Sequence, residues 1–208
     1  MHAKHITVVV VGAFIGVAVA LMLLPEARSR IFAPAHVSAG AASGGPFTLT
    51  DVSGKQVTDR DYRGRYMLVF FGYTSCPDIC PTALQTIAGA LEKLGSKAEA
   101  VAPIFISVDP ERDAPEKLRT YVRSFDPRIV GLTGTRDEVA AAAKAYRVYF
   151  ARVPGKDGEY TIDHSAIIYL MDPDGRFATH FNAGATSTEI AAKLSALVNH
   201  ATGVAGDR

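Results

Sequence analysis

The two cysteines of the chain, Cys76 and Cys80, stand four residues apart and directly follow an apolar segment. Residues 67–71 are short, apolar and aromatic, which predicts a buried strand. A helix is predicted after the cysteines, with its apolar face at Leu84, Ile87, Ala88, Leu91 and Leu94 and its end near Gly95. The cysteines therefore lie where a strand turns into a helix, and helix amides at such a position lower the pKa of a thiol.

Residues four apart are neighbours on a helix, so this spacing predicts two sulfurs on one face. The pair can form one disulfide, bind one metal ion, or do both at different times. Two inert buried thiols are the alternative, but Pro77 and Pro81 bracket the pair and make a plain helix interior a poor description. A peroxidase loop needs Thr three residues before its reactive cysteine, where this chain has Tyr73 and Pro77.

The rest of the chain must position partners for these cysteines. Apolar runs and turn signals predict further strands at residues 47–50, 56–57, 101–108, 129–132, 149–153, 160–162, 165–171 and 177–181. Capping boxes at residues 113–116, 135–138 and 186–189 predict the starts of three more helices. This order predicts an α/β fold with a mixed central sheet flanked by helices. With cysteines after the first core strand, it is the order of a thioredoxin-like fold.

His164 is the third residue whose type suits a metal site. We place it at the start of the strand at residues 165–171, in a loop that faces the cysteines in a thioredoxin-like fold. Thioredoxins carry a proline there, whereas this loop reads Asp163-His164-Ser165. Two thiolates and an imidazole suit Cu(I), Cu(II) or Zn(II), and a solvated surface histidine is the alternative. The other histidines are weaker candidates: His2, His5, His36, His180 and His200.

Four segments together resemble the Sco/SenC family of copper-binding thioredoxin-fold proteins, which assist cytochrome c oxidase assembly. They are residues 71–81 (Phe-Gly-Tyr-Thr-Ser-Cys-Pro-Asp-Ile-Cys-Pro), 107–113 (Ser-Val-Asp-Pro-Glu-Arg-Asp), 131–135 and 163–165. The resemblance covers roughly residues 46–200. It implies that Cys76, Cys80 and His164 are copper ligands, and that an anchor holds the domain outside the cytoplasm.

Three acidic and basic residues follow the second core strand. Asp109 either orients a metal ligand or only turns the chain before Pro110. Arg112 and Asp113 are interpreted as turn and cap residues.

Residues 6–24 carry no charge and are long enough to span a bilayer. We predict an uncleaved anchor at residues 1–24, a tether rich in Ala, Gly, Ser and Pro at 25–45, and a globular domain at 46–208. A cleaved signal peptide is the alternative, because Ala18-Val19-Ala20 has the spacing of a cleavage site. The net charge of +1, without a dense Lys/Arg cluster, argues against a nucleic-acid partner.

The sequence thus favours a membrane-anchored copper metallochaperone that delivers one ion to a copper-receiving subunit of a respiratory oxidase. We expect a single pass of the inner membrane, with the domain on the periplasmic or equivalent side. The alternative is a thiol–disulfide oxidoreductase, or a redox sensor, in which Cys76 and Cys80 cycle between dithiol and disulfide. His164 discriminates between these hypotheses, because a reductase needs no imidazole there.

Overall fold

The computed structural model describes residues 44–182 and 184–205. These residues belong to one compact unit, Ala42–Arg208. The predicted anchor at residues 6–24 and the tether up to residue 43 lie outside the described residues. Among the helices that are described, none has the length and apolar character needed to cross a bilayer.

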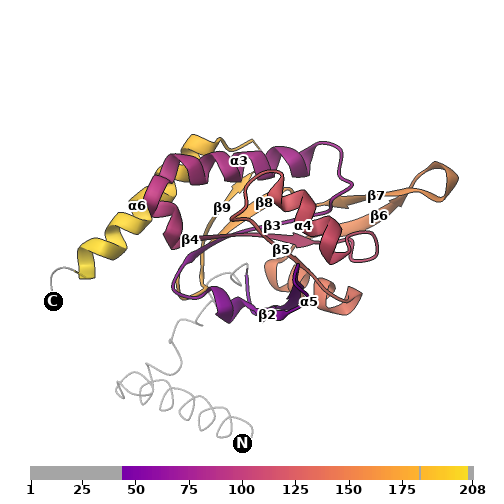
Figure 1. The fold of residues 1–208 in the computed structure, drawn as a ribbon, viewed down its shortest axis with the longest axis horizontal. Helices are drawn as coiled ribbons and strands as arrows, with labels where there is room; N and C mark the ends of the chain where they lie inside the picture. Colours follow the sequence, from indigo (N-terminus) through magenta and orange to yellow (C-terminus); the bar gives the residue numbers. More distant parts are fainter. Residues whose placement is uncertain (1–43, 183, 206–208) are drawn as a thin grey trace, which may run out of the picture. The chain divides into compact units, whose positions relative to one another are not determined.

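A seven-stranded sheet forms the centre of the domain, in the order β2-β1-β5-β4-β3-β8-β9 (Figure 1). Its strands are β1 (Thr48–Asp51), β2 (Gln56–Thr58), β3 (Tyr66–Gly72), β4 (Val101–Ser107), β5 (Val130–Thr133), β8 (Ile167–Met171) and β9 (Phe177–Asn182). β3, β4 and β5 run parallel, and the remaining pairs are antiparallel. The predicted α/β fold with a mixed central sheet is therefore confirmed. Every residue of β3 and β4 is buried, as expected for strands covered on both faces.

Within the described residues, four α-helices cover this sheet: α3 (Ile79–Leu94), α4 (Pro115–Arg123), α5 (Arg136–Tyr146) and α6 (Ser187–Ala205). Short 3-10 turns lie at Asp59–Tyr62, Gly95–Ala100 and Lys156–Gly158. α3 packs against α6 on one face of the sheet, and α5 lies on the other face near β1 (Figure 1). α3 follows β3 directly, so the carboxyl end of β3 and the amino end of α3 meet at the cysteines.

Two of the three predicted capping boxes are confirmed. Thr135 and Glu138 exchange hydrogen bonds at the start of α5, and Thr186 and Glu189 do the same at the start of α6. The third, which gave Asp113 as a cap residue, is wrong. α4 begins after Ala114, which offers no side-chain cap, and Asp113 is fully buried below the cysteine loop.

The predicted strands at residues 149–153 and 160–162 pair as a hairpin, which forms a sheet of its own. β6 (Phe150–Pro154) and β7 (Tyr160–His164) pair only with each other and extend beyond the end of the central sheet (Figure 1). We call this pair the β-ribbon. His164 is its last residue, whereas β8 begins at Ile167, so the predicted position of His164 at the start of the next strand is wrong.

Candidate metal centre

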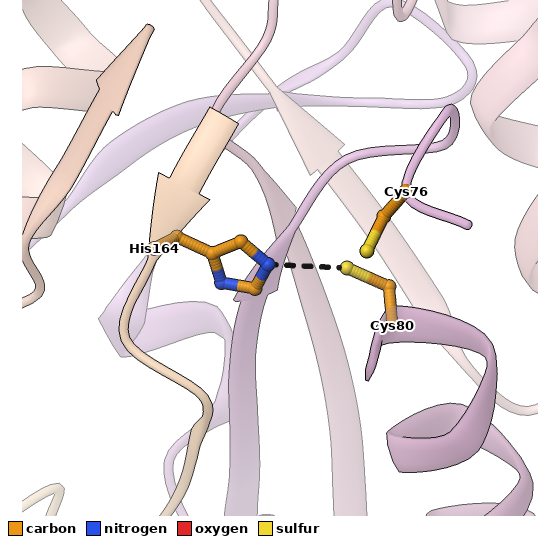
Figure 2. Close-up of side chains that lie close together, drawn as sticks. All are labelled: Cys76, Cys80 and His164. Atoms are coloured by element: carbon orange, nitrogen blue, oxygen red, sulfur yellow. Dashed lines mark hydrogen bonds between the residues drawn. The ribbon is translucent and has the colours of Figure 1, made fainter. Parts of the chain in front are cut away.

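The two sulfurs lie together at the amino end of α3 (Figure 2). Cys80 is in the first turn of the helix and fully buried, and Cys76 is half-buried in the loop between β3 and α3. The helix begins at Ile79, so only one cysteine is helical. The predicted placement of both sulfurs on one helical face is therefore wrong, and it is the loop that folds Cys76 back toward the helix.

Gly72, the last residue of β3, makes room for the Cys80 sulfur. A Cβ atom at this position would lie 2.7 Å from Cys80 Sγ and 2.9 Å from Phe105 Cε2, far inside van der Waals contact. Sequence reasoning missed this residue. The signal was available, because a glycine at the end of a buried strand often marks a close approach of another group.

Asp113 holds the loop that carries Cys76. Its carboxylate accepts hydrogen bonds from Thr74 N at 2.9 Å, Thr74 Oγ1 at 2.5 Å and Ser107 Oγ at 2.7 Å. Because the side chain is fully buried, these bonds replace its hydration. The loop is thereby fastened to the carboxyl end of β4.

His164 brings the third donor from the β-ribbon (Figure 2). Its Nε2 lies 3.3 Å from Cys80 Sγ, and its Nδ1 lies 3.2 Å from the carbonyl oxygen of Ser165. An Nδ1–H that donates to this carbonyl leaves the Nε2 lone pair free to bind a metal. The ring is held edge-on by Phe70 and Tyr73, with centroids at 6.0 and 5.9 Å.

The two sulfurs and one imidazole nitrogen all lie within 4.8 Å of one another. Metal–sulfur bonds of about 2.3 Å and metal–nitrogen bonds of about 2.0 Å can close around one ion in such a group. The donor set suits copper or zinc and does not suit the hard, oxygen-seeking ions. The structure thus brings together the three residues singled out from sequence. His180 is exposed on β9 and stacks on Phe177, away from the cysteines.

The two thiols differ in acidity. A hydrogen bond from the Cys80 side chain, helped by the backbone amides of Cys80 and Asp78, lowers the pKa of Cys76 to about 4. The same hydrogen bond, together with burial, raises the pKa of Cys80 far above its usual range. Without a metal, Cys76 is therefore the thiolate and Cys80 retains its proton at neutral pH.

A family model described as SCO1/SenC matches residues 35–199. The chain belongs to this family. It is 44% identical over 155 residues to the human protein named "Protein SCO1 homolog, mitochondrial", a match that covers 73% of this chain and 52% of the relative. The chain thus spans about half the length of that curated relative.

Solved structures of Sco proteins match the domain closely. Bradyrhizobium japonicum ScoI with copper bound is 54% identical, with a TM-score of 0.70, and the match covers 74% of this chain and 98% of that one. A second solved structure, of BsSco, is 26% identical. BsSco is described as a member of the Sco family of cytochrome c oxidase assembly proteins in which a disulfide switch was identified. Its TM-score is 0.59, with 77% of this chain and 95% of that chain covered.

A pocket of about 450 Å³ opens the Sco-family site to solvent on the Cys76 side. Its lining includes Cys76 and His164, the half-exposed Ile79 and the largely exposed Tyr149. Cys80 is not part of this lining. A group that enters the pocket therefore reaches the Cys76 sulfur before the Cys80 sulfur.

Asp109 interacts with neighbouring side chains rather than with the three donors. Its carboxylate contacts the side chains of Arg112, Tyr160 and Arg152, and among the described residues no contact joins it to a cysteine or to His164. Arg112 does lie in a turn, as its backbone amide donates to Asp109 O at 3.2 Å. The interpretation of Arg112 as a turn residue gave its guanidinium no function, but in the structure this group pairs with Asp109.

Proposed function

We propose that this chain is a copper metallochaperone for cytochrome c oxidase assembly, binding one ion through Cys76, Cys80 and His164. The observation that carries the proposal is the convergence of two sulfurs and one imidazole nitrogen within 4.8 Å. Relatives support it, since structures of Sco proteins from Bradyrhizobium japonicum and from yeast are described with copper bound. Copper is here the cargo of the protein.

The geometry suits both oxidation states of the cargo. Two thiolates satisfy Cu(I), which accepts low coordination, whereas Cu(II) prefers more ligands and uses the imidazole nitrogen. Delivery proceeds by ligand exchange, in which thiolates of the receiving subunit displace Cys76 first and Cys80 second. This order follows from the pocket, which exposes Cys76 and leaves Cys80 buried.

The test of the metal site is substitution of His164 by Ala, with His180→Ala, an exposed histidine on β9, as the matched control. His164→Ala should abolish the thiolate-to-Cu(II) charge-transfer absorption, keep Cu(I) binding, and leave formation of the Cys76–Cys80 disulfide intact. His180→Ala should change none of these. In cells, oxidase assembly should fail at low copper with His164→Ala, and normal assembly would contradict the metallochaperone proposal.

A second function, thiol–disulfide exchange, is favoured by the asymmetry of the pair. Cys76 is accessible and its pKa is lowered, as expected for the thiol that attacks a partner. Cys80 is buried, as expected for the thiol that resolves the mixed disulfide. Here the pair would reduce the cysteines of the oxidase subunit, and the imidazole would be dispensable. Normal oxidase assembly by His164→Ala, together with its loss in Cys76→Ser, would select this function.

The site would be held at a membrane by residues 6–24, as a single-pass anchor with the domain on the periplasmic or equivalent side. The uncharged run in the sequence supports this location. The full-length protein should resist extraction by alkaline carbonate, and protease added outside should remove the domain. A soluble mature chain that begins near Leu21 would contradict the anchor.

A further inference from the structure

The β-ribbon carries His164 but is not part of the central sheet, so contacts with the rest of the domain must set its position. Side chains alternate along a strand, which places Tyr160, Ile162 and His164 on one face of β7. Ile162 on this face is buried, whereas Thr161 and Asp163 on the other face are exposed. The face that bears the imidazole is therefore the face that packs on the domain.

Arg112 is the centre of the contacts on this face. Its Nε donates to Asp109 Oδ2 at 2.5 Å, and its Nη1 donates to the backbone oxygen of Tyr160 at 2.9 Å. The guanidinium also lies over the Tyr160 ring, with Cζ 3.6 Å from the centroid. The Tyr160 hydroxyl donates to Asp109 Oδ1 at 2.8 Å and closes the ring of contacts. We call Asp109, Arg112 and Tyr160 the Arg112 clamp.

The clamp is a stiff connection. Asp109 is fully buried, so its charge depends on Arg112 and on the Tyr160 hydroxyl for the hydrogen bonds that water would otherwise give. The Tyr73 hydroxyl accepts a second bond from the ribbon, from Ile162 N at 3.3 Å. β7 is thus held at Tyr160 and at Ile162, which lie four and two residues before His164.

We propose that the Arg112 clamp positions His164, holding β7 so that the imidazole stays beside the cysteine sulfurs. The clamp touches neither sulfur, so it acts on the nitrogen side of the site alone. Since Cu(II) depends on the imidazole and Cu(I) does not, the clamp governs which oxidation state the site retains. This last consequence rests on the proposed function, whereas the positioning itself concerns only residues of this chain.

Two variants weaken the clamp to different degrees. Arg112→Met removes the guanidinium and keeps an apolar chain of similar length. Tyr160→Phe removes one hydroxyl and keeps the ring, so it should fold even if the loss of Arg112 unfolds the domain. Arg128→Met is the matched control, because Arg128 also pairs with a buried carboxylate, Asp126, at 2.7 Å. Arg128 precedes β5, at the end of the sheet opposite to the site.

The first measurement uses the metal-free protein. Amide hydrogen exchange in β7 should become about tenfold faster in Arg112→Met, which removes several contacts of the clamp, and about threefold faster in Tyr160→Phe, which removes one hydrogen bond. Exchange in β3 should stay unchanged in both variants. Arg128→Met should leave β7 unchanged relative to the rest of the domain.

The second measurement adds copper. Cu(II) should dissociate about tenfold faster from Arg112→Met, with a weaker charge-transfer band, while Cu(I) affinity should stay within about twofold, because the thiolates are untouched. Circular dichroism reports whether each variant is folded, and if Arg112→Met is unfolded, Tyr160→Phe decides alone.

Unchanged exchange in β7 in the folded clamp variants would overturn the proposal, and so would equal effects in Arg128→Met. If the unsubstituted protein binds no Cu(II) but the clamp variants still loosen β7, the positioning holds and the proposed function fails.

Discussion

The sulfur side and the nitrogen side of the metal centre are built in opposite ways. Cys80 lies in the buried core, against Gly72 at the end of β3, and the loop of Cys76 is fastened to β4 by the buried Asp113. His164 comes from a two-stranded ribbon that forms a sheet of its own and is held by the Arg112 clamp at Tyr160. We therefore expect the sulfurs to keep their places until the domain unfolds, and the imidazole to be the first donor lost when contacts are weakened.

This difference matches what the proposed function of copper delivery needs. A pair of thiolates in a rigid setting retains the ion, and a ligand on a separate arm can be gained or lost when the oxidation state or the partner changes. The comparison makes quantitative predictions, because changes on the sulfur side should affect global stability and changes in the ribbon should not.

The largest loss is expected for Asp113→Ala. The substitution leaves the amide and hydroxyl of Thr74 and the hydroxyl of Ser107 without their buried acceptor. The free energy of unfolding should fall by about 3 kcal/mol in urea titrations. Asp174→Ala, which removes an exposed ion pair with Arg176, should cost less than about 0.5 kcal/mol. Equal losses would mean that the cysteine loop is not fastened by Asp113.

A second large difference should separate the two thiols in the reduced, metal-free protein. Cys76 should react with iodoacetamide about a hundredfold faster than Cys80, because it is more accessible and already a thiolate at neutral pH. Its pKa is lowered to about 4, so protonation and loss of reactivity should begin only as the pH falls toward that value. Between pH 6 and 8 the Cys76 rate should stay nearly constant, whereas an ordinary thiol gains about tenfold per pH unit. Peptide mass spectrometry distinguishes the sites, and equal labelling would refute the asymmetry.

Gly72→Ala should cost less than Asp113→Ala but damage the site directly. The new methyl group would meet Cys80 Sγ and Phe105, so the sulfur and the ring must both shift. We expect a loss of about 2 kcal/mol in unfolding free energy. Gly64→Ala tests the methyl group alone at a position with no neighbour within 4 Å, although the positive φ there adds some strain. If Gly72→Ala is as stable as the unsubstituted protein and binds copper normally, the core around Cys80 is looser than described.

The smallest effect is expected on the exposed face of the ribbon. Val153 is 39% exposed on β6 and pairs with Thr161, on the face opposite to the one that carries Tyr160. Val153→Thr keeps the β-branched shape and should change the unfolding free energy by less than about 0.5 kcal/mol. The Cu(II) absorption should be the same, and a weakened band would show that the whole ribbon, rather than the face that packs on the domain, positions His164.

Local patterns in the sequence were sufficient for the order of elements. The apolar run before the cysteines is β3, and the boxes at Thr135 and Thr186 begin α5 and α6 as predicted. The family motifs pointed to Cys76, Cys80 and His164 as one group, and the structure places these side chains together. Their assignment as ligands remains a proposal.

The errors have a common cause. Asp113 has the spacing of a cap residue, but its partner Thr74 lies 39 residues away, and no local pattern reports such a pair. The same holds for Tyr160 and Asp109, and for Gly72 and Cys80, which meet only in the folded chain. Helix and strand periodicities describe neighbours along one element, whereas these contacts depend on how separate elements pack.

The distance along the chain between Cys80 and His164 has a consequence for the order of assembly. The two residues are 84 positions apart, so the imidazole can reach the sulfurs only after the ribbon has docked on the domain. Closing so long a loop is slow and entropically costly, whereas the β3–α3 turn forms from neighbours. A chain that has not yet docked the ribbon should thus present two thiols and no imidazole, which exposes it to premature oxidation. Pulsed alkylation during refolding should find Cys80 protected before hydrogen exchange reports a closed β7.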